Sequence, residues 1–198
     1  MGKAISVKRK NVKERLGRPK RPAHKKYGLQ DRRRTQMANE SILERTGSYQ
    51  FSRIVMGKLK IGTDLLEGIK EIARKEAIRS GIILSGIGAL QKAVFRNAKI
   101  MPPDYKMEDK YRVFIDLEQP MELVSLPGWI ATKENGEIEV HAHFTASLVM
   151  DDKVVTLGGH LTPGTIASIK VIIVIGVIDD PKVKAAVDPA INQTEIYF

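Results

Sequence analysis

The sequence predicts an α+β fold, in which a mostly antiparallel β-sheet carries one main amphipathic helix. Three observations support this prediction. Apolar residues recur at helical spacing over one long stretch, at about 63–80. The remainder of the chain after residue 48 alternates between short apolar stretches and Gly, Pro or Asp turns. The chain has 198 residues, 42% hydrophobic and 28% charged, which suits one globular domain with appendages.

The helix is predicted to begin after Gly62, where Thr63 or Asp64 can cap the first free backbone N–H groups. It is expected to end near Gly81, a residue type that favours the position after a helix, and to span about four to five turns. Charged side chains occupy the face opposite the apolar one, as in a helix that lies on a core. The apolar face consists of Leu65, Leu66, Ile69, Ile72, Ala73 and Ala77.

Strands are predicted where short stretches are apolar or alternate between apolar and polar residues. Gly86 and Gly88 lack the Lys-Ser/Thr pair that follows a phosphate-binding loop, so they indicate close backbone packing or a bulge. Asp151-Asp-Lys153 predicts a hairpin turn. The expected strands lie at 52–60, 81–90, 93–98, 111–117, 121–126, 129–132, 138–150, 154–157 and 167–178.

The positive charge is concentrated at the N-terminus. The formal net charge is +10, but residues 1–47 carry 15 Lys or Arg against 4 Asp or Glu, a net charge of +11. The remaining residues carry 18 basic against 19 acidic side chains, a net charge of −1. We therefore expect a basic arm at 1–47, a nearly neutral domain at 48–182 and a C-terminal tail at 183–198.

The arm has few apolar residues up to Gly28 and cannot bury enough surface to order itself, although a short helix is possible over 30–44. Four basic clusters within 27 residues favour an anionic polymer as the partner. The clusters are Lys8, Arg9 and Lys10, then Lys20 and Arg21, then Lys25 and Lys26, and finally Arg32, Arg33 and Arg34.

The segment Arg15-Leu-Gly-Arg-Pro-Lys-Arg-Pro22 resembles an AT-hook, a short extended binder of the DNA minor groove. Gly17 has no side chain to hold the backbone away from the groove floor, and Arg18 can lie along a narrow A·T groove. Leu16 stands where the AT-hook pattern has its first arginine, so one groove-inserted arginine is missing. The residues expected to contact nucleic acid here are Arg15, Gly17, Arg18, Pro19, Lys20 and Arg21.

Three of the four histidines are candidate metal ligands. In Glu139-Val-His-Ala-His143 the polar residues alternate, so His141 and His143 project from one face of a strand. A hairpin that turns at 151–152 pairs residues whose numbers sum to about 303, which places His143 opposite His160. Three imidazoles from two paired strands favour a metal site, typically zinc with one open position.

Other interpretations of these residues stay open. A buried histidine often serves only as a hydrogen-bonded core residue. Glu137 or Glu139 could act as a second-shell acceptor, a fourth ligand or a general base, or could be exposed strand residues without a role. The cupin barrel also uses His-x-His and a later His, but the long early helix and the lack of a cupin-spaced glutamate after His143 count against it.

Five ordered motifs over about 48–178 resemble the plant-and-prokaryote conserved (PPC) domain. They are Gly62-Thr-Asp-Leu-Leu66, Ser85-Gly-Ile-Gly-Ala-Leu90, Leu123-Val-Ser-Leu-Pro-Gly-Trp-Ile130, His141-Ala-His143 and Gly158-Gly-His-Leu161. The resemblance implies a compact domain that forms a trimer through its sheets. Plant members carry AT-hooks ahead of this domain and bind AT-rich DNA. Some prokaryotic members look like zinc proteins, and His141, His143 and His160 would be the ligands here.

The leading hypothesis is a non-enzymatic DNA-binding protein, in which a trimeric scaffold presents three basic arms. The alternative is a metal-dependent enzyme or a small-molecule-binding protein that uses the three histidines. RNA is a further possible partner, since composition does not separate it from DNA, although Tyr27 is the only aromatic residue of the arm.

Cysteine is absent from the sequence, which excludes disulfides, thiolate metal sites and a cysteine nucleophile. No apolar run reaches the ~18 residues that a membrane span requires, and the N-terminus lacks the apolar core of a signal peptide. We therefore expect no membrane span and a cytoplasmic location, associated with the nucleoid in a prokaryote or nuclear in a eukaryote.

Overall fold

The structure is a computed structural model that describes residues 42–198. The AT-hook-like segment and the basic clusters lie outside the described residues, and so does the possible helix over 30–44 apart from 42–44, which form no helix. Residues Arg45–Phe198 form one compact unit, and the fold below is that of this unit.

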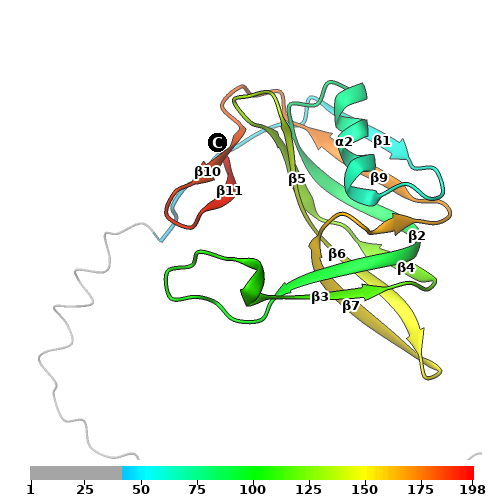
Figure 1. Ribbon diagram of the computed structural model, residues 1–198. Helices are drawn as coiled ribbons and strands as arrows, with labels where there is room; N and C mark the ends of the chain where they lie inside the picture. The colour runs from blue at the N-terminus through cyan, green and yellow to red at the C-terminus, as the bar shows by residue number, and fades with distance from the viewer. Residues whose placement is uncertain (1–41) are drawn as a thin grey trace, which may run out of the picture. The chain divides into compact units, whose positions relative to one another are not determined.

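One antiparallel sheet of nine strands dominates the unit (Figure 1). Its longest strand, β2, pairs with β5 and β9 along its first half and with β3, β4, β7 and β8 along its second half. In chain order the elements are β1 (Arg53–Lys58), α2 (Leu65–Lys75), β2 (Ser80–Ala98), η2 (Asp109–Tyr111), β3 (Arg112–Leu117), β4 (Met121–Ser125), β5 (Gly128–Thr132), β6 (Ile138–Met150), β7 (Lys153–Leu161), β8 (Ile166–Ala167), β9 (Ile172–Val177), β10 (Lys184–Asp188) and β11 (Gln193–Tyr197). The predicted α+β class is therefore confirmed.

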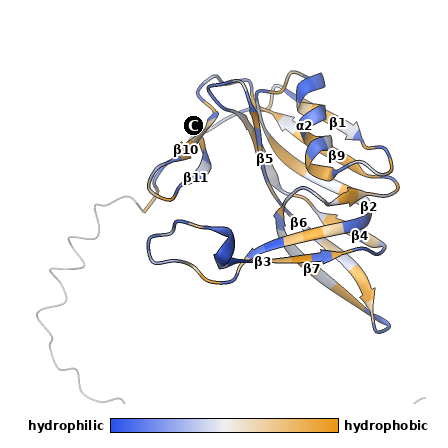
Figure 2. Ribbon diagram, in the orientation of Figure 1, coloured by the Kyte–Doolittle hydropathy of each residue, from blue (hydrophilic) through white to orange (hydrophobic). Residues whose placement is uncertain are grey.

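The helix α2 begins as the sequence predicts. The Asp64 carboxylate accepts hydrogen bonds from the backbone N–H groups of Leu66 and Glu67, at 3.0 and 3.1 Å. On its apolar face, the Ile72 side chain packs against β1, where Gly57 leaves room for it. Figure 2 shows hydrophilic residues on α2 alternating with apolar ones, as expected for a helix with one face on the core.

The end of α2 differs from the prediction. The helix stops at Lys75, and Ala77 takes a left-handed φ of 49°. The chain then turns so that Ile78, 2% exposed, enters the core and its N–H bonds to the Ala73 carbonyl oxygen at 2.8 Å. Gly81 does not follow the helix but lies inside β2, paired with Ile130 and Val177. Burial of Ile78 outweighs the preference of glycine for a helix end.

Several strand boundaries also differ from the sequence pattern. The stretches predicted at 81–90 and 93–98 form one strand, β2, whose pairing shifts register near Leu90 and Lys92. The stretch predicted at 167–178 is split into β8 and β9, with Lys170 at a left-handed φ of 59° between them. β7 runs four residues beyond the predicted 154–157, to Leu161. Residues 183–198, expected as a tail, contain the β10–β11 hairpin.

The core lies on one face of the sheet. The Phe95 and Phe144 rings stack there, with centroids 4.8 Å apart, and each is 1% exposed. Along β6 the buried residues alternate with outward ones, so that Ala142 and Phe144 face the core while His143 faces away. The apolar packing therefore determines which side chains project from the opposite face.

Gly86 and Gly88 serve backbone packing, as predicted. A Cβ on Gly86 would lie 2.6 Å from the Leu126 side chain. Gly88 has a φ of 139°, and a Cβ there would lie 2.6 Å from the Lys170 carbonyl oxygen and from Val171 Cα. Gly88 therefore lets β2 approach the chain before β9, and Gly86 leaves room for the Leu126 side chain.

We predict that Gly88→Ala lowers the free energy of unfolding by about 3 kcal/mol, because backbone strain adds to a backbone clash. Urea denaturation measures this change. Gly136→Ala is the control, since Gly136 also has a positive φ of 85° but has nothing within 4 Å of its Cβ position. It should cost only about 1 kcal/mol. Equal losses in the two variants would contradict the packing role of Gly88.

Candidate metal centre

The two histidine strands pair in the predicted register. In the β6–β7 hairpin, His143 lies directly opposite His160. Cross-strand partners project from the same side of a sheet, and His141 shares that side because it is two residues from His143. The prediction that the hairpin turn at 151–152 brings these histidines together is confirmed.

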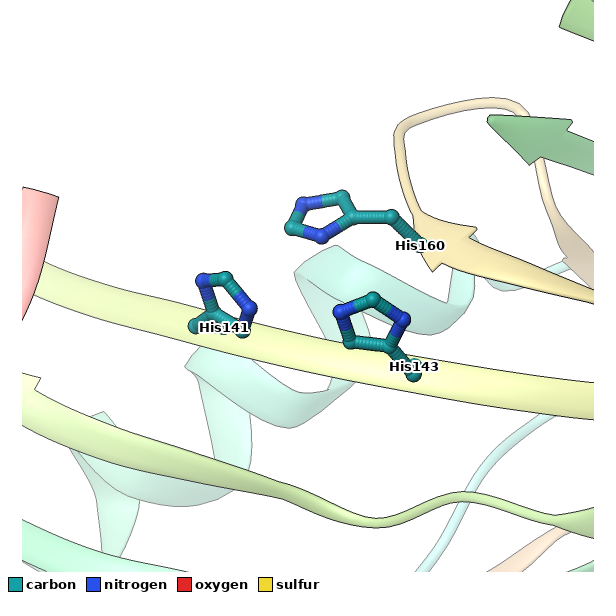
Figure 3. Close-up of side chains that lie close together, drawn as sticks. All are labelled: His141, His143 and His160. Carbon is teal, nitrogen blue, oxygen red and sulfur yellow. The ribbon is translucent and has the colours of Figure 1, made fainter. Parts of the chain in front are cut away.

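The three imidazoles converge on one point (Figure 3). The ring centroids are 5.3 Å apart for His141 and His143, 4.7 Å for His141 and His160, and 5.0 Å for His143 and His160. One ring nitrogen of each residue lies within 4.8 Å of the others, an arrangement that could hold a metal ion. His143 is exposed and the other two are half-buried, so the group is open to solvent on one side.

Trp129 orients His141. The two residues are cross-strand partners on β5 and β6, and their rings stack with centroids 5.3 Å apart and an interplanar angle of 15°. No role for Trp129 could be predicted from the sequence, because the pattern does not show that β5 pairs with β6. This contact limits how far the His141 ring can turn away from the group.

The carboxylates of Glu137 and Glu139, the two acidic candidates near the histidines, both form ion pairs with Lys133. Lys133 Nζ is 2.8 Å from a carboxylate oxygen of Glu139 and 3.2 Å from one of Glu137. The hydrogen bonds to Glu139 and Glu137 raise the pKa of Lys133. The hydrogen bond between Lys133 and Glu137 also lowers the pKa of Glu137. Neither carboxylate belongs to the compact ligand group, which contains three imidazoles. Within residues 42–198 the structure therefore supplies nitrogen ligands there and no acidic one.

The surroundings of all three imidazoles favour their neutral form. Burial, followed by the positive charge of Arg96, lowers the pKa of His160 to about 3 and lowers that of His143. Burial and then His143 lower the pKa of His141, with Arg96 adding a smaller effect. A neutral imidazole offers a nitrogen lone pair, which is the form that binds a metal.

This donor set fits a transition metal. Imidazole nitrogens suit zinc, copper, iron and nickel, whereas calcium and magnesium prefer oxygen ligands. Three protein ligands leave one position of a tetrahedral ion free for water or another ligand, as in catalytic zinc sites. The structure thus defines a β-rich domain with one helix and a three-histidine group that could bind a metal.

The sequence places this domain in a known family. Residues 46–179 match the Plants and Prokaryotes Conserved (PCC) domain, the family called PPC above, and the chain belongs to it. The predicted resemblance is therefore confirmed over most of the chain. None of the helices within 42–198 has the length and apolar character needed to cross a membrane.

Solved structures share the fold. A PPC protein from Pyrococcus horikoshii is 28% identical, with a TM-score of 0.57 over 74% of this chain and 92% of its own. A metal-containing protein from Archaeoglobus fulgidus is 22% identical, with a TM-score of 0.59 over 78% of this chain and 97% of its own. A candidate DNA-binding protein from Ralstonia eutropha JMP134 is 24% identical, with a TM-score of 0.56 over 72% of this chain and 90% of its own.

Curated relatives are much longer proteins. The bifunctional protein GlmU of Synechococcus sp. (strain JA-2-3B'a(2-13)) is 27% identical over 149 residues, which are 72% of this chain and 21% of that protein. Its counterpart in Synechococcus sp. (strain JA-3-3Ab) is 26% identical over 146 residues, which are 74% of this chain and 20% of that protein. The chain spans about a fifth of the length of these relatives.

We predict that His143→Ala or His160→Ala lowers the metal affinity at least 100-fold, because each removes one of three ligands. Metal content after dialysis, measured by mass spectrometry, checks this. The control is His24→Ala, which removes the fourth histidine of the sequence. Equal metal retention in all variants would show that the group is not the binding site.

The lowered histidine pKa values predict an acid-sensitive apoprotein. The pKa of His160 is about 3 in the folded chain and about 6.5 when unfolded, so below pH 6.5 only the unfolded chain gains a proton. The contribution of neutral His160 to stability is therefore present above pH 6.5 and is lost as the pH falls toward 3. With chelator present, urea midpoints should fall less between pH 7.5 and 5 in His160→Gln than in the wild type. Identical pH profiles would contradict the shift.

Proposed function

We propose that this protein binds DNA through its basic arm, with the PPC domain as the scaffold that presents the arm. The supporting observation is the charge distribution of the sequence, with +11 on residues 1–47 and −1 on the remainder. Binding to a polyanion is driven by phosphate contacts and counterion release, which require such a concentration of basic side chains. A nearly neutral domain supplies little of that force. Some structural neighbours are candidate DNA-binding proteins, which agrees with this proposal.

Within the arm, the AT-hook-like segment at 15–22 would enter the minor groove, and the flanking clusters would contact phosphates. Leu16 replaces one groove-directed arginine, so selectivity for A·T pairs would be modest. Most of the affinity would then be electrostatic and independent of sequence. Such binding would place the protein on the nucleoid of a prokaryotic cytoplasm, or in a eukaryotic nucleus.

The scaffold would be a homotrimer. Exposed apolar side chains on the sheet support this, since Val149 and Val154 are cross-strand partners that are 61% and 75% exposed. They line a cavity of about 660 Å³ together with Ile169, which is 50% exposed. A trimer would carry three arms, and their modest affinities would combine through a high effective concentration.

A second candidate function is chemistry or small-molecule binding at the three-histidine group, with zinc as the metal. The open side at His143 favours it, because a purely structural zinc site has all four positions filled by protein. Bound zinc would supply Lewis acidity or an activated water. In this chain His141, His143 and His160 would hold the ion, and Trp129 would fix the orientation of His141.

Replacing Arg32, Arg33 and Arg34 by Gln should flatten the salt dependence of DNA binding. The slope of log K against log salt should fall in magnitude by up to about 3, because up to three phosphate contacts are lost. Fluorescence anisotropy with AT-rich DNA, GC-rich DNA and RNA measures the slope and separates the possible partners. The matched control replaces Lys70, Arg74 and Lys75 of α2 by Gln, which removes three positive charges from the domain.

The arm hypothesis fails if the α2 variant loses as much DNA affinity as the arm variant, or if deletion of residues 1–47 leaves binding unchanged. The same titration with His143→Ala separates the two candidate functions. DNA affinity that persists in this variant assigns binding to the arm. A loss of DNA affinity that parallels the loss of metal would instead assign DNA binding to the metal centre.

A further inference from the structure

Arg96 projects from the same side of the sheet as the three histidines. β7 lies between β6 and β2, and His160 is the cross-strand partner of both His143 and Arg96. Arg96 in turn lies opposite Phe114 on β3. Cross-strand partners project from one side of a sheet, so these four side chains form a continuous row over four strands.

Gly159 allows this arrangement. A Cβ on Gly159 would lie only 3.1 Å from both the backbone nitrogen and the carbonyl oxygen of Arg96. A side chain at residue 159 would therefore force β7 and β2 slightly apart at this point. The neighbouring Asn97 amide donates a hydrogen bond to the Gly158 carbonyl oxygen at 2.8 Å, which fastens the same contact.

Arg96 has no anionic partner among residues 42–198. It is half-buried, yet it makes no ion pair and its guanidinium makes no hydrogen bond there. Burial, and then the repulsion of Arg112, lower the pKa of Arg96. Arg112 itself bonds to Asp109 at 2.9 Å and to Gln193 at 3.2 Å, so its own donors are engaged. Asp109 is 79% exposed and offers only weak compensation.

The local charge is therefore unbalanced. The ligand group has no carboxylate, and the half-buried Arg96 brings a positive charge that forms no ion pair among residues 42–198, whereas the charge of Arg112 is paired with Asp109. A divalent metal would add two more. Buried or half-buried charges are normally paired, so this concentration of positive charge indicates a binding position for an anion.

We propose that a small oxyanion, carrying a phosphate or carboxylate group, binds between the metal at the three histidines and the Arg96 guanidinium. This inference rests on the metal site proposed above. The planar guanidinium can donate two parallel hydrogen bonds to such a group, and the open metal position accepts an oxygen ligand.

The surroundings favour a small ion over a DNA backbone. His141, His160 and Arg96 are half-buried, and the Arg112 side chain is only 15% exposed. The Gln193 side chain holds Arg112 in place, because it accepts a hydrogen bond from Arg112 and donates one to the Met107 carbonyl oxygen at 3.3 Å. A position formed by half-buried side chains suits a small ion rather than the phosphate backbone of a duplex.

The test uses the full chain loaded with Co²⁺, whose visible absorption reports ligands at the open position. Inorganic phosphate and malonate are titrated separately, which distinguishes phosphate from carboxylate ligands. We expect Arg96→Gln to keep the wild-type cobalt stoichiometry and to bind the preferred anion at least 10-fold more weakly. Arg96→Lys should be intermediate, because it keeps the charge but loses the bidentate geometry. Arg74→Gln on α2 is the matched control and should bind like the wild type.

Wild-type anion affinity in both Arg96 variants, or no spectral response of the wild type to either anion, overturns the inference while leaving the metal site intact. A wild-type protein that binds no cobalt overturns the metal site itself. A short DNA duplex added as competitor should leave the cobalt spectrum unchanged. Displacement of the anion by the duplex in an Arg96-dependent way would assign the site to DNA phosphate and overturn the small-molecule proposal.

Discussion

The pairing of β6 with β7 is the constraint on which both the core and the candidate metal centre depend. Its register places Phe144 in the core and His143 opposite His160 on the other side of the sheet. A shift of one residue would exchange the two faces, so that imidazoles entered the core and apolar side chains entered the solvent. Because that exchange is energetically costly, the register is fixed and the histidines keep their positions. The apolar core thus positions a polar site that itself adds little to the stability of the fold.

The two proposed activities belong to different parts of the chain. The domain beyond residue 47 has a net charge of −1, so long-range attraction to a polyanion must come from the arm. The positive charge near the histidines is local, because it comes from the half-buried Arg96 and from Arg112, whose side chain is 15% exposed and pairs with Asp109. A half-buried cationic position and a strongly basic segment suit different anions, so the two proposed activities do not depend on each other.

Local signals predicted the histidine site well, and non-local pairing hid the rest of it. The His-x-His alternation and a tight turn at 151–152 determine the register of a hairpin within some 20 residues, so His143 and His160 could be paired from the sequence. Arg96 reaches His160 across 64 residues, and no pattern marks that contact. The predicted strand at 154–157 ended before Gly158-Gly159, whereas β7 continues through both glycines to Leu161. The end of α2 depends on the burial of Ile78, a tertiary effect that helix-end preferences do not include.

X-ray absorption at the metal edge of the purified full-length protein tests the central claim most directly, since it reads the ligands without assuming a reaction. The account predicts three imidazole nitrogens at about 2.0–2.1 Å, with the multiple scattering that imidazole rings give, and one further light-atom ligand. The imidazole signal should lose one ring in His160→Ala. A shell of oxygen ligands without imidazole scattering, or a protein that retains no metal, would contradict the assignment of His141, His143 and His160 as a metal centre.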